Sequence, residues 1–500
     1  MSIWGLSIIC SGVIFRADNR CSPKRFNKMK AIIRYLKNLN LEYSVLLLWI
    51  FSLPVMSNRY LGSGSLFQRA QIFDFVFVFL VSISLIKFLN GCIKFTVTRL
   101  WLVLVMLIVS FLISSLNSEV PLIGFSESLV ILYLITIYLF VANVIRDRKI
   151  LSLCLKGWVF TSLIIALLGI SGMILAFFGF NNYFVRFYFD FLNKAFRLIS
   201  TMSLPNMAYS YLHVSFFLTL GLLINETHKK RRAFYLFAII VLLIALFFTF
   251  SRGWVSLLFG SGIFLYFFSK EGKLKFKGIA KVLFLLAFIV FVFVQLFITY
   301  TTDLNFSLKY GYDDTYKVDY SNEARNKLFK QDYFFDQGQP YRRLDLGIIF
   351  LPGEYGYKKM AAVKLWQEHP LFGIGPGMFN VFSVRLAESK ALYFPKNIAP
   401  CDPHSTYFGS LAEGGLFGLG VLFILFFYFL KILAKAFKRM KEQYFRNLIL
   451  CCISAFSGLL VFGLDVDIMN FRWLWFLMGL SIAIIRIYDS ENGRGPLLKG

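Results

Sequence analysis

Apolar runs of about twenty residues recur along most of this chain, and they constrain its fold more than any other feature. The hydrocarbon core of a bilayer is about 30 Å thick, and an α-helix crosses it in about 20 residues. The composition agrees, since 58% of the 500 residues are hydrophobic and 60 of them are Phe. A transmembrane β-barrel needs alternating polar and apolar residues, which these runs lack. We therefore predict an all-α polytopic membrane protein.

The runs predict about twelve transmembrane helices. Their expected ranges are 41–56, 71–89, 99–116, 121–143, 157–179, 206–225, 233–250, 253–269, 279–299, 404–430, 447–464 and 470–487. One large loop separates the ninth span from the tenth and contains short helices, expected at 357–369 and 377–390. The predicted organisation is a basic N-terminal segment (1–40), spans one to nine (41–300), the large loop (301–403), spans ten to twelve (404–487) and a C-terminal tail (488–500).

The positive charges predict the orientation of these spans. The formal net charge is +26, but the basic residues stand in short clusters between apolar runs, so we do not expect nucleic acid as a partner. Most of the 53 Lys and Arg residues fall in every second connection, and such connections stay in the cytoplasm, where they also contact anionic lipids. Both termini are therefore predicted to be cytoplasmic and the large loop external. Met1 and Met29 are both candidate start residues.

The cysteines predict neither a metal site nor a cofactor. Seven Cys residues occur without a CxxC pair and without Cys/His metal-ligand spacing. No disulfide framework is expected, and the sequence does not identify a protein partner.

His404 is the first candidate for chemistry, because it stands where the large loop turns into an apolar span. Pro403 before it and Ser405 after it suit the start of a helix. A histidine at a membrane-water boundary has a pKa suited to a general base, and Asp402 is near enough in sequence to orient it. The alternative is that His404 is merely an interfacial residue.

Two arginines are expected on the same external side. Arg252 lies in a very tight turn between two spans, and Arg197 precedes the sixth span. Arginine near hydrocarbon costs about 2.5–3.5 kcal/mol, and a site that tolerates this cost commonly binds an anion. The planar guanidinium suits bidentate binding of phosphate, so the pair predicts a site for a lipid-linked diphosphate. The alternative is that Arg252 reaches lipid headgroups or pairs with Asp465 or Asp467.

Other polar residues on this side are candidates for holding the rest of a substrate. Asn206 follows Arg197 at the start of the sixth span. Glu413, Glu127 and Asp74 lie in or near the outer halves of spans. Each of these three acids either holds a sugar hydroxyl or pairs with an arginine.

The sequence resembles the O-antigen ligase/polymerase superfamily of bacterial membrane glycosyltransferases. The similarity is carried by SRG at Arg252, HPLFGIGPG in the large loop, PHSTYFGSLAEGGLFG at the tenth span, and more weakly by RLISTMSLPN, and it covers roughly 195–430. The resemblance implies helices around a periplasmic cavity in the inner membrane. It also implies a donor glycan linked to undecaprenyl diphosphate and an acceptor hydroxyl, with no metal and no nucleotide sugar.

The same resemblance implies roles for individual residues. His404 would activate the acceptor hydroxyl and Arg252 would bind the donor diphosphate. The family has a further loop arginine before a Trp, and this sequence departs there. Lys358 and Lys359 occupy the approximate place, and Arg342 with Arg343 lie further upstream, so all four are candidate diphosphate ligands.

Four functions remain open on the sequence, and one of them is a non-catalytic scaffold for an envelope assembly complex. A ligase would transfer the glycan to lipid A-core, whereas a polymerase would transfer it to another lipid-linked repeat unit. A transporter of polysaccharide or lipid-linked sugar is the other alternative outside enzymes, although its path would need charged residues at mid-span depth.

Overall fold

We analysed a computed structural model of the whole chain. It describes residues 41–56, 71–89, 98–180, 182–189, 194–251, 253–270, 354–388 and 403–493. The expected span 279–299, Arg252, Arg342, Arg343 and Asp402 lie outside the described residues.

The described chain is mostly helical, with 79% of its residues in helices. The helices are α2 (Leu41–Ser52), α3 (Ile72–Leu89), α4 (Leu100–Leu116), α5 (Pro121–Val144), α6 (Arg148–Phe177), α7 (Pro205–Asn225), α8 (Lys229–Phe248), α9 (Trp254–Lys270), α13 (Glu354–Glu368), α14 (Phe379–Glu388), α15 (Thr406–Arg439), α16 (Gln443–Phe462) and α17 (Arg472–Glu491). Each predicted span other than 279–299 corresponds to one of them. Seven of the described helices are long and apolar enough to cross a membrane, and three shorter ones are also apolar. These helices identify a membrane protein, while the twelve-span topology and its orientation stay predictions.

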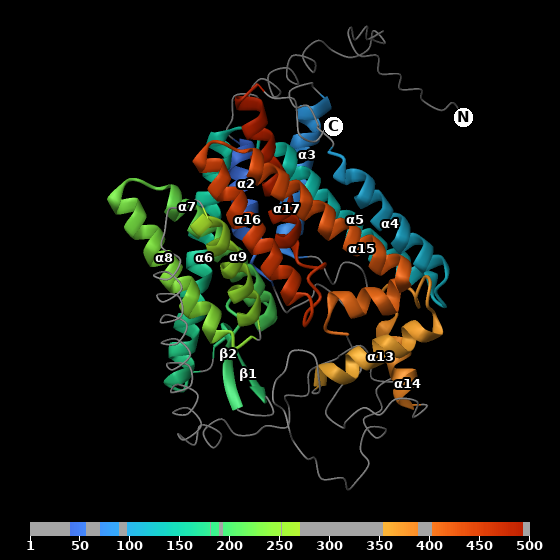
Figure 1. The fold of residues 1–500 in the computed structure, drawn as a ribbon. Helices are drawn as coiled ribbons and strands as arrows, with labels where there is room; N and C mark the ends of the chain where they lie inside the picture. Colours follow the sequence, from blue (N-terminus) through green and yellow to red (C-terminus); the bar gives the residue numbers. More distant parts are fainter. Residues whose placement is uncertain are drawn as a thin grey trace, which may run out of the picture.

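The long helices form a bundle whose connections gather at its two ends (Figure 1). The end that carries α13 and α14 is called the loop end below. There Met56 N, after α2, donates to Thr201 O, before α7, at 2.9 Å. At the same end Arg472, which starts α17, pairs with Asp74 of α3 at 3.2 Å. The connections predicted to be external therefore lie together in the described part of the chain.

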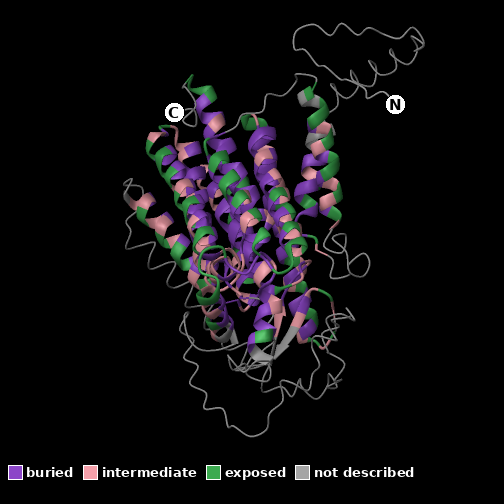
Figure 2. Ribbon diagram, turned by 90° about the vertical axis from the view of Figure 1, so that its right-hand side faces the viewer, coloured by how far each residue is buried: buried purple, intermediate pink, exposed green. Residues whose placement is uncertain are grey.

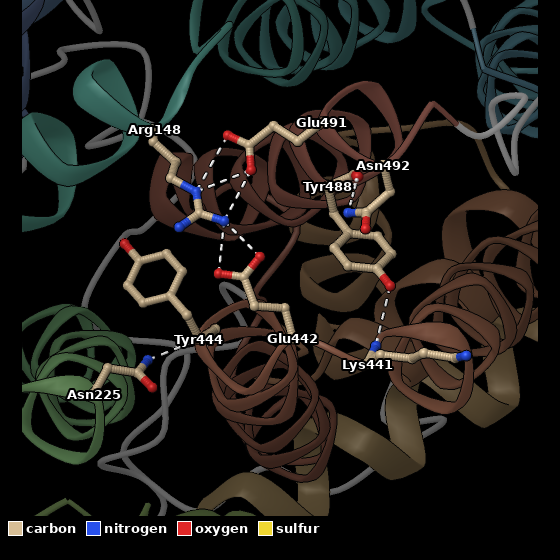
Figure 3. Close-up of polar contacts among 8 residues, drawn as sticks. All are labelled: Arg148, Asn225, Lys441, Glu442, Tyr444, Tyr488, Glu491 and Asn492. Carbon is tan, nitrogen blue, oxygen red and sulfur yellow. Dashed lines mark hydrogen bonds and ion pairs between the residues drawn. The ribbon is translucent and has the colours of Figure 1, made fainter.

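At the opposite end, Arg148 joins three helices (Figure 3). Arg148 starts α6, and its Nη2 donates to Glu442, before α16, at 2.6 Å. The same nitrogen lies 2.8 Å from Glu491, at the end of α17. The guanidinium also lies 5.5 Å from the ring centroid of Tyr444. These groups are partly exposed, so the contact aligns the helix ends more than it stabilises them.

Tryptophans fill the centre of the bundle, where Figure 2 shows the buried residues concentrated. Trp158 of α6 stacks on Phe476 of α17 with ring centroids 4.4 Å apart. Buried indole N–H groups need acceptors, and the Nε1 atoms of Trp158 and Trp473 donate to Ser215 and Ser210 of α7 at 2.9 and 3.1 Å. α6, α7 and α17 are thereby held together at the core.

A two-stranded hairpin at the loop end departs from the all-α prediction. β1 (Val185–Phe189) pairs antiparallel with β2 (Lys194–Leu198), and Arg186 lies opposite Arg197. The segment is short and rich in aromatic residues, which favour strands. The sequence alone predicts no strand in this connection.

The two largest differences from the expected helix boundaries are in α6 and α15. α6 begins at Arg148 instead of 157, because Asp147 caps it by accepting from Ile150 N at 2.9 Å. α15 runs to Arg439 instead of 430. In both cases a basic stretch that we assigned to a connection continues the helix.

α15 is broken at Gly415, which has φ 62° and ψ −163°. A continuous helix would pair Ala412 O with Leu416 N and Glu413 O with Phe417 N. The loop 369–377, called the inserted loop below, replaces both bonds. Ile374 N and Gly375 N donate to Ala412 O and Glu413 O, both at 3.0 Å. Leu416 N and Phe417 N donate to Pro370 O and Leu371 O at 2.9 and 3.1 Å. In Figure 1 the two parts of α15 consequently run in different directions.

The backbone conformation and the lack of space for a side chain both require glycine at position 415. Its positive φ is unfavourable for other residues, and an added Cβ would lie 2.4 Å from Leu371 C. Replacing Gly415 with Ala is expected to destabilise the protein by at least about 1–3 kcal/mol. The measurement is thermal unfolding of the detergent-solubilised protein.

The neighbouring Gly414 provides a matched control, because an added Cβ there meets no atom within 4 Å. Gly414→Ala is expected to leave stability unchanged or to raise it by about 0.5–1 kcal/mol, since Ala favours helix over Gly. Equal unfolding temperatures for the two variants would contradict the described break.

Candidate functional site

Backbone strain in the described chain concentrates in the sequence motifs. Three non-glycine residues there have positive φ, namely Ser200 at 54°, Phe250 at 46° and His404 at 46°. They belong to RLISTMSLPN, to the turn before SRG and to PHSTYFG, respectively. Such conformations cost about 1–3 kcal/mol each and persist where the surrounding structure enforces them, commonly at functional sites. The motifs are therefore strained segments that their neighbours hold in place.

Arg197 holds the turn that leads to Arg252. Its Nε donates to Thr249 O at 3.0 Å and its Nη2 to Phe250 O at 2.9 Å. These carbonyls follow the last turn of α8, where the helix dipole attracts a cation. Arg197 was predicted to bind diphosphate. In the structure its guanidinium donates to two backbone carbonyls of this turn.

Asn206 and Tyr209 hold the same turn from α7. Ser251 Oγ donates to Asn206 Oδ1 at 3.0 Å. The hydroxyl of Tyr209 donates to Gly253 O, and an added Cβ at Gly253 would lie 2.1 Å from the Tyr209 ring. Ser251 and Gly253, the two neighbours of Arg252 in the chain, are therefore both held by side chains of α7. Sequence reasoning missed Tyr209, although its i, i+3 spacing from Asn206 places the two on one helix face.

The start of α15 is anchored to the turn between α16 and α17. Ser405 Oγ and Thr406 N donate to Gly463 O at 3.1 and 2.9 Å. Thr406 Oγ1 also accepts from Ile468 N at 2.8 Å. Both side chains are buried, whereas His404 is half-buried. These contacts fix the backbone on which the His404 imidazole stands.

Tyr209 connects the turn around Arg252 with the start of α15. Its hydroxyl contacts Gly253, and its ring lies 5.0 Å from that of Phe462, centroid to centroid. Phe462 immediately precedes Gly463, the residue that anchors Thr406. The SRG turn and His404 are therefore at the same end of the bundle, joined through α7 and α16.

Glu413, a candidate substrate ligand, contacts the large loop. Its Oε1 accepts from the backbone N–H of Phe379, the first residue of α14, at 3.2 Å. Carboxylates suit this position because the first amides of a helix lack partners and carry partial positive charge. The side chain therefore positions α14 beside the break in α15.

Lys358 and Lys359 lie on α13, within the loop end. Lys359 Nζ is 2.8 Å from Asp465 Oδ1, and the two side chains are only 9% and 13% exposed. The ion pair attaches α13 to the turn that follows α16. Lys358 is buried. Asp465, which we considered as a partner for Arg252, is thus in contact with a loop cation.

Asp74 pairs with an arginine, which is one of the two roles predicted for it. Besides the ion pair with Arg472, it accepts from Gln71 N at 2.7 Å and from the hydroxyl of Tyr133. The guanidinium of Arg472 lies 3.8 Å from the ring centroid of Phe73. These contacts hold the start of α3 against the start of α17.

Comparison with known families and with curated proteins found no match to this chain. A function for this chain is therefore inferred from its motifs and from the geometry just described.

Proposed function

We propose that this protein is an O-antigen ligase-like glycosyltransferase. It would transfer a glycan from undecaprenyl diphosphate to a hydroxyl of lipid A-core at the periplasmic face of a bacterial inner membrane. The observation that carries the proposal is the gathering of the strained motif residues, Ser200, Phe250 and His404, at one end of the helix bundle. A fold maintains such strain where it fixes reacting groups.

The proposed reaction uses His404 as a general base. Its imidazole takes the proton of the acceptor hydroxyl while the oxygen attacks the anomeric carbon of the donor sugar. The bond between that carbon and the diphosphate oxygen breaks, and undecaprenyl diphosphate leaves with the electron pair. Arg252 would stabilise the charge that develops on the leaving group. The chemistry needs no change in oxidation state.

Other residues act by positioning these two. Arg197 and Tyr209 bind backbone carbonyls on the two sides of Arg252, and Asn206 accepts from the side chain of Ser251. Ser405 and Thr406 fix the backbone beside His404. Since a misplacement of about 1 Å costs about 10²-fold in rate, this scaffold supports transfer as much as the reacting groups do. Lys358, Lys359, Arg342 and Arg343 remain candidates for a second cation at the diphosphate.

A repeat-unit polymerase of the same superfamily is the closest alternative. It would use the same groups but a lipid-linked acceptor, so its products grow with successive transfers. A purified-protein assay with a lipid-linked donor and each acceptor separates the two by product size. Translocation of the donor in vesicles without bond formation would instead indicate a transporter.

The first test is His404→Asn, because Asn tolerates the left-handed conformation of this residue but is not a base. Transfer by the purified variant is expected to fall by about 10²–10⁴-fold. Unfolding temperature and membrane insertion are expected to stay the same.

His228→Asn is the control for this substitution. His228 is an exposed histidine before α8, at the end of the bundle opposite the loop end, and it should keep full activity. Transfer by His404→Asn at the wild-type rate would exclude the proposed base.

A second test removes one hydroxyl from the scaffold. Tyr209→Phe keeps the ring against Phe462 but deletes the bond to Gly253 O. A neutral hydrogen bond contributes about 0.5–1.5 kcal/mol, so KM for the donor is expected to rise about 2- to 10-fold. The measurement is steady-state transfer over a range of donor concentrations.

Tyr211→Phe is the matched control for this second test. Tyr211 is equally buried in α7, its ring packs against Trp158 and Trp473, and its hydroxyl has no hydrogen-bond partner among the described residues. If both Phe variants had the same KM, Tyr209 would have no specific role at the turn.

A further inference from the structure

Two large apolar side chains at the tip of the inserted loop are exposed. Leu371 is 62% exposed and Phe372 is 37% exposed. The other face of the loop is packed, since Ile374 is buried in a cluster with Leu365 and Met378. The loop therefore has one face toward the protein and one apolar face without cover from the described residues.

The depth of this tip is fixed by α15. Leu371 O accepts from Phe417 N and Pro370 O from Leu416 N, at 3.1 and 2.9 Å. The rings of Phe372 and Phe417 are 5.9 Å apart, centroid to centroid. The tip thus lies level with the first turn of the second part of α15, a helix long and apolar enough to cross a membrane.

The exposed tip continues an exposed face of that helix. Large apolar residues on this face recur with helical spacing and are exposed; they are Leu416, Phe417, Phe423, Ile424 and Phe427. In a membrane-spanning helix such a face is covered by lipid. Phe372, whose ring contacts Phe417, continues this face beyond the break at Gly415, and the exposed Leu371 is its neighbour in the loop.

The neighbouring parts of the loop segment have polar exposed groups. Gln367 and Glu368 are exposed at the end of α13. On α14, Arg385 forms an exposed ion pair with Glu119 at 2.7 Å. Within a few residues the exposed groups therefore change from polar ones to Leu371 and Phe372.

We infer that the tip of the inserted loop is a membrane-embedded segment, with Leu371 and Phe372 among the acyl chains of the bilayer. Four backbone groups of the loop, at Pro370, Leu371, Ile374 and Gly375, are bonded to the broken α15 and so do not need water at this depth. The large loop, predicted from sequence to be wholly external, is then anchored in the membrane beside the start of α15. This inference goes beyond the proposed function and does not depend on transfer activity.

The test places a photoreactive benzophenone amino acid at position 371 of the full chain. The protein is reconstituted in phosphatidylethanolamine/phosphatidylglycerol vesicles and irradiated, and adducts are identified by mass spectrometry. Position 427 on α15 is the lipid-facing reference. Position 360 is the control, because Met360 is a 51% exposed apolar residue on α13, away from the tip. Position 372 is labelled in parallel, so that the result does not depend on one variant folding.

Phospholipid adducts at 371 and 372 are expected to match those at 427 and to exceed those at 360 by about tenfold, given the preference of apolar side chains for hydrocarbon. Lipid adducts at 371 and 372 no more frequent than at 360 would overturn the inference. Predominant crosslinks to a second copy of the chain would also overturn it, because they would identify a protein as the cover of this face.

Discussion

The structure at the loop end depends on how four backbone groups around Gly415 are satisfied. A helix interrupted in or near hydrocarbon leaves N–H and C=O groups that water cannot reach, and each costs several kcal/mol if unpaired. The inserted loop supplies partners for Ala412 O, Glu413 O, Leu416 N and Phe417 N. Because those partners are backbone atoms, the loop has little freedom to take another path. The break in α15 and the shape of the loop are therefore a single feature.

This feature determines where the rest of the loop segment lies. Glu413 caps α14 from one side of the break, and Lys359 of α13 pairs with Asp465 beside the anchor of Thr406. α13, α14 and the first part of α15 thus become one unit with the turn between α16 and α17. His404 stands at the edge of that unit in a left-handed conformation. On the proposed function, a movement of α13 or α14 would therefore reach the backbone beside His404.

The sequence predicted the helices well and the irregular segments poorly. Apolar runs identify helices such as α5 and α16 because hydrocarbon thickness limits their length. They say nothing about the hairpin around Arg186 and Arg197, or about Gly415, since these depend on contacts between segments far apart in the chain. The motifs indicated His404, Arg197 and Asn206 as important, and the last two contact the turn around Arg252, Arg197 through backbone carbonyls and Asn206 through Ser251. A sequence motif does not distinguish a residue that binds the substrate from a residue that positions the binding residue.

The most direct test of the central claim is a cryo-EM structure of the protein with undecaprenyl diphosphate bound. The claim is that the SRG turn and His404 form one site at the loop end. It predicts diphosphate density against the turn formed by residues 249–253, with the sugar-bearing end of the diphosphate facing the imidazole of His404. Diphosphate density elsewhere on the protein, with neither Arg252 nor His404 beside it, would contradict the account.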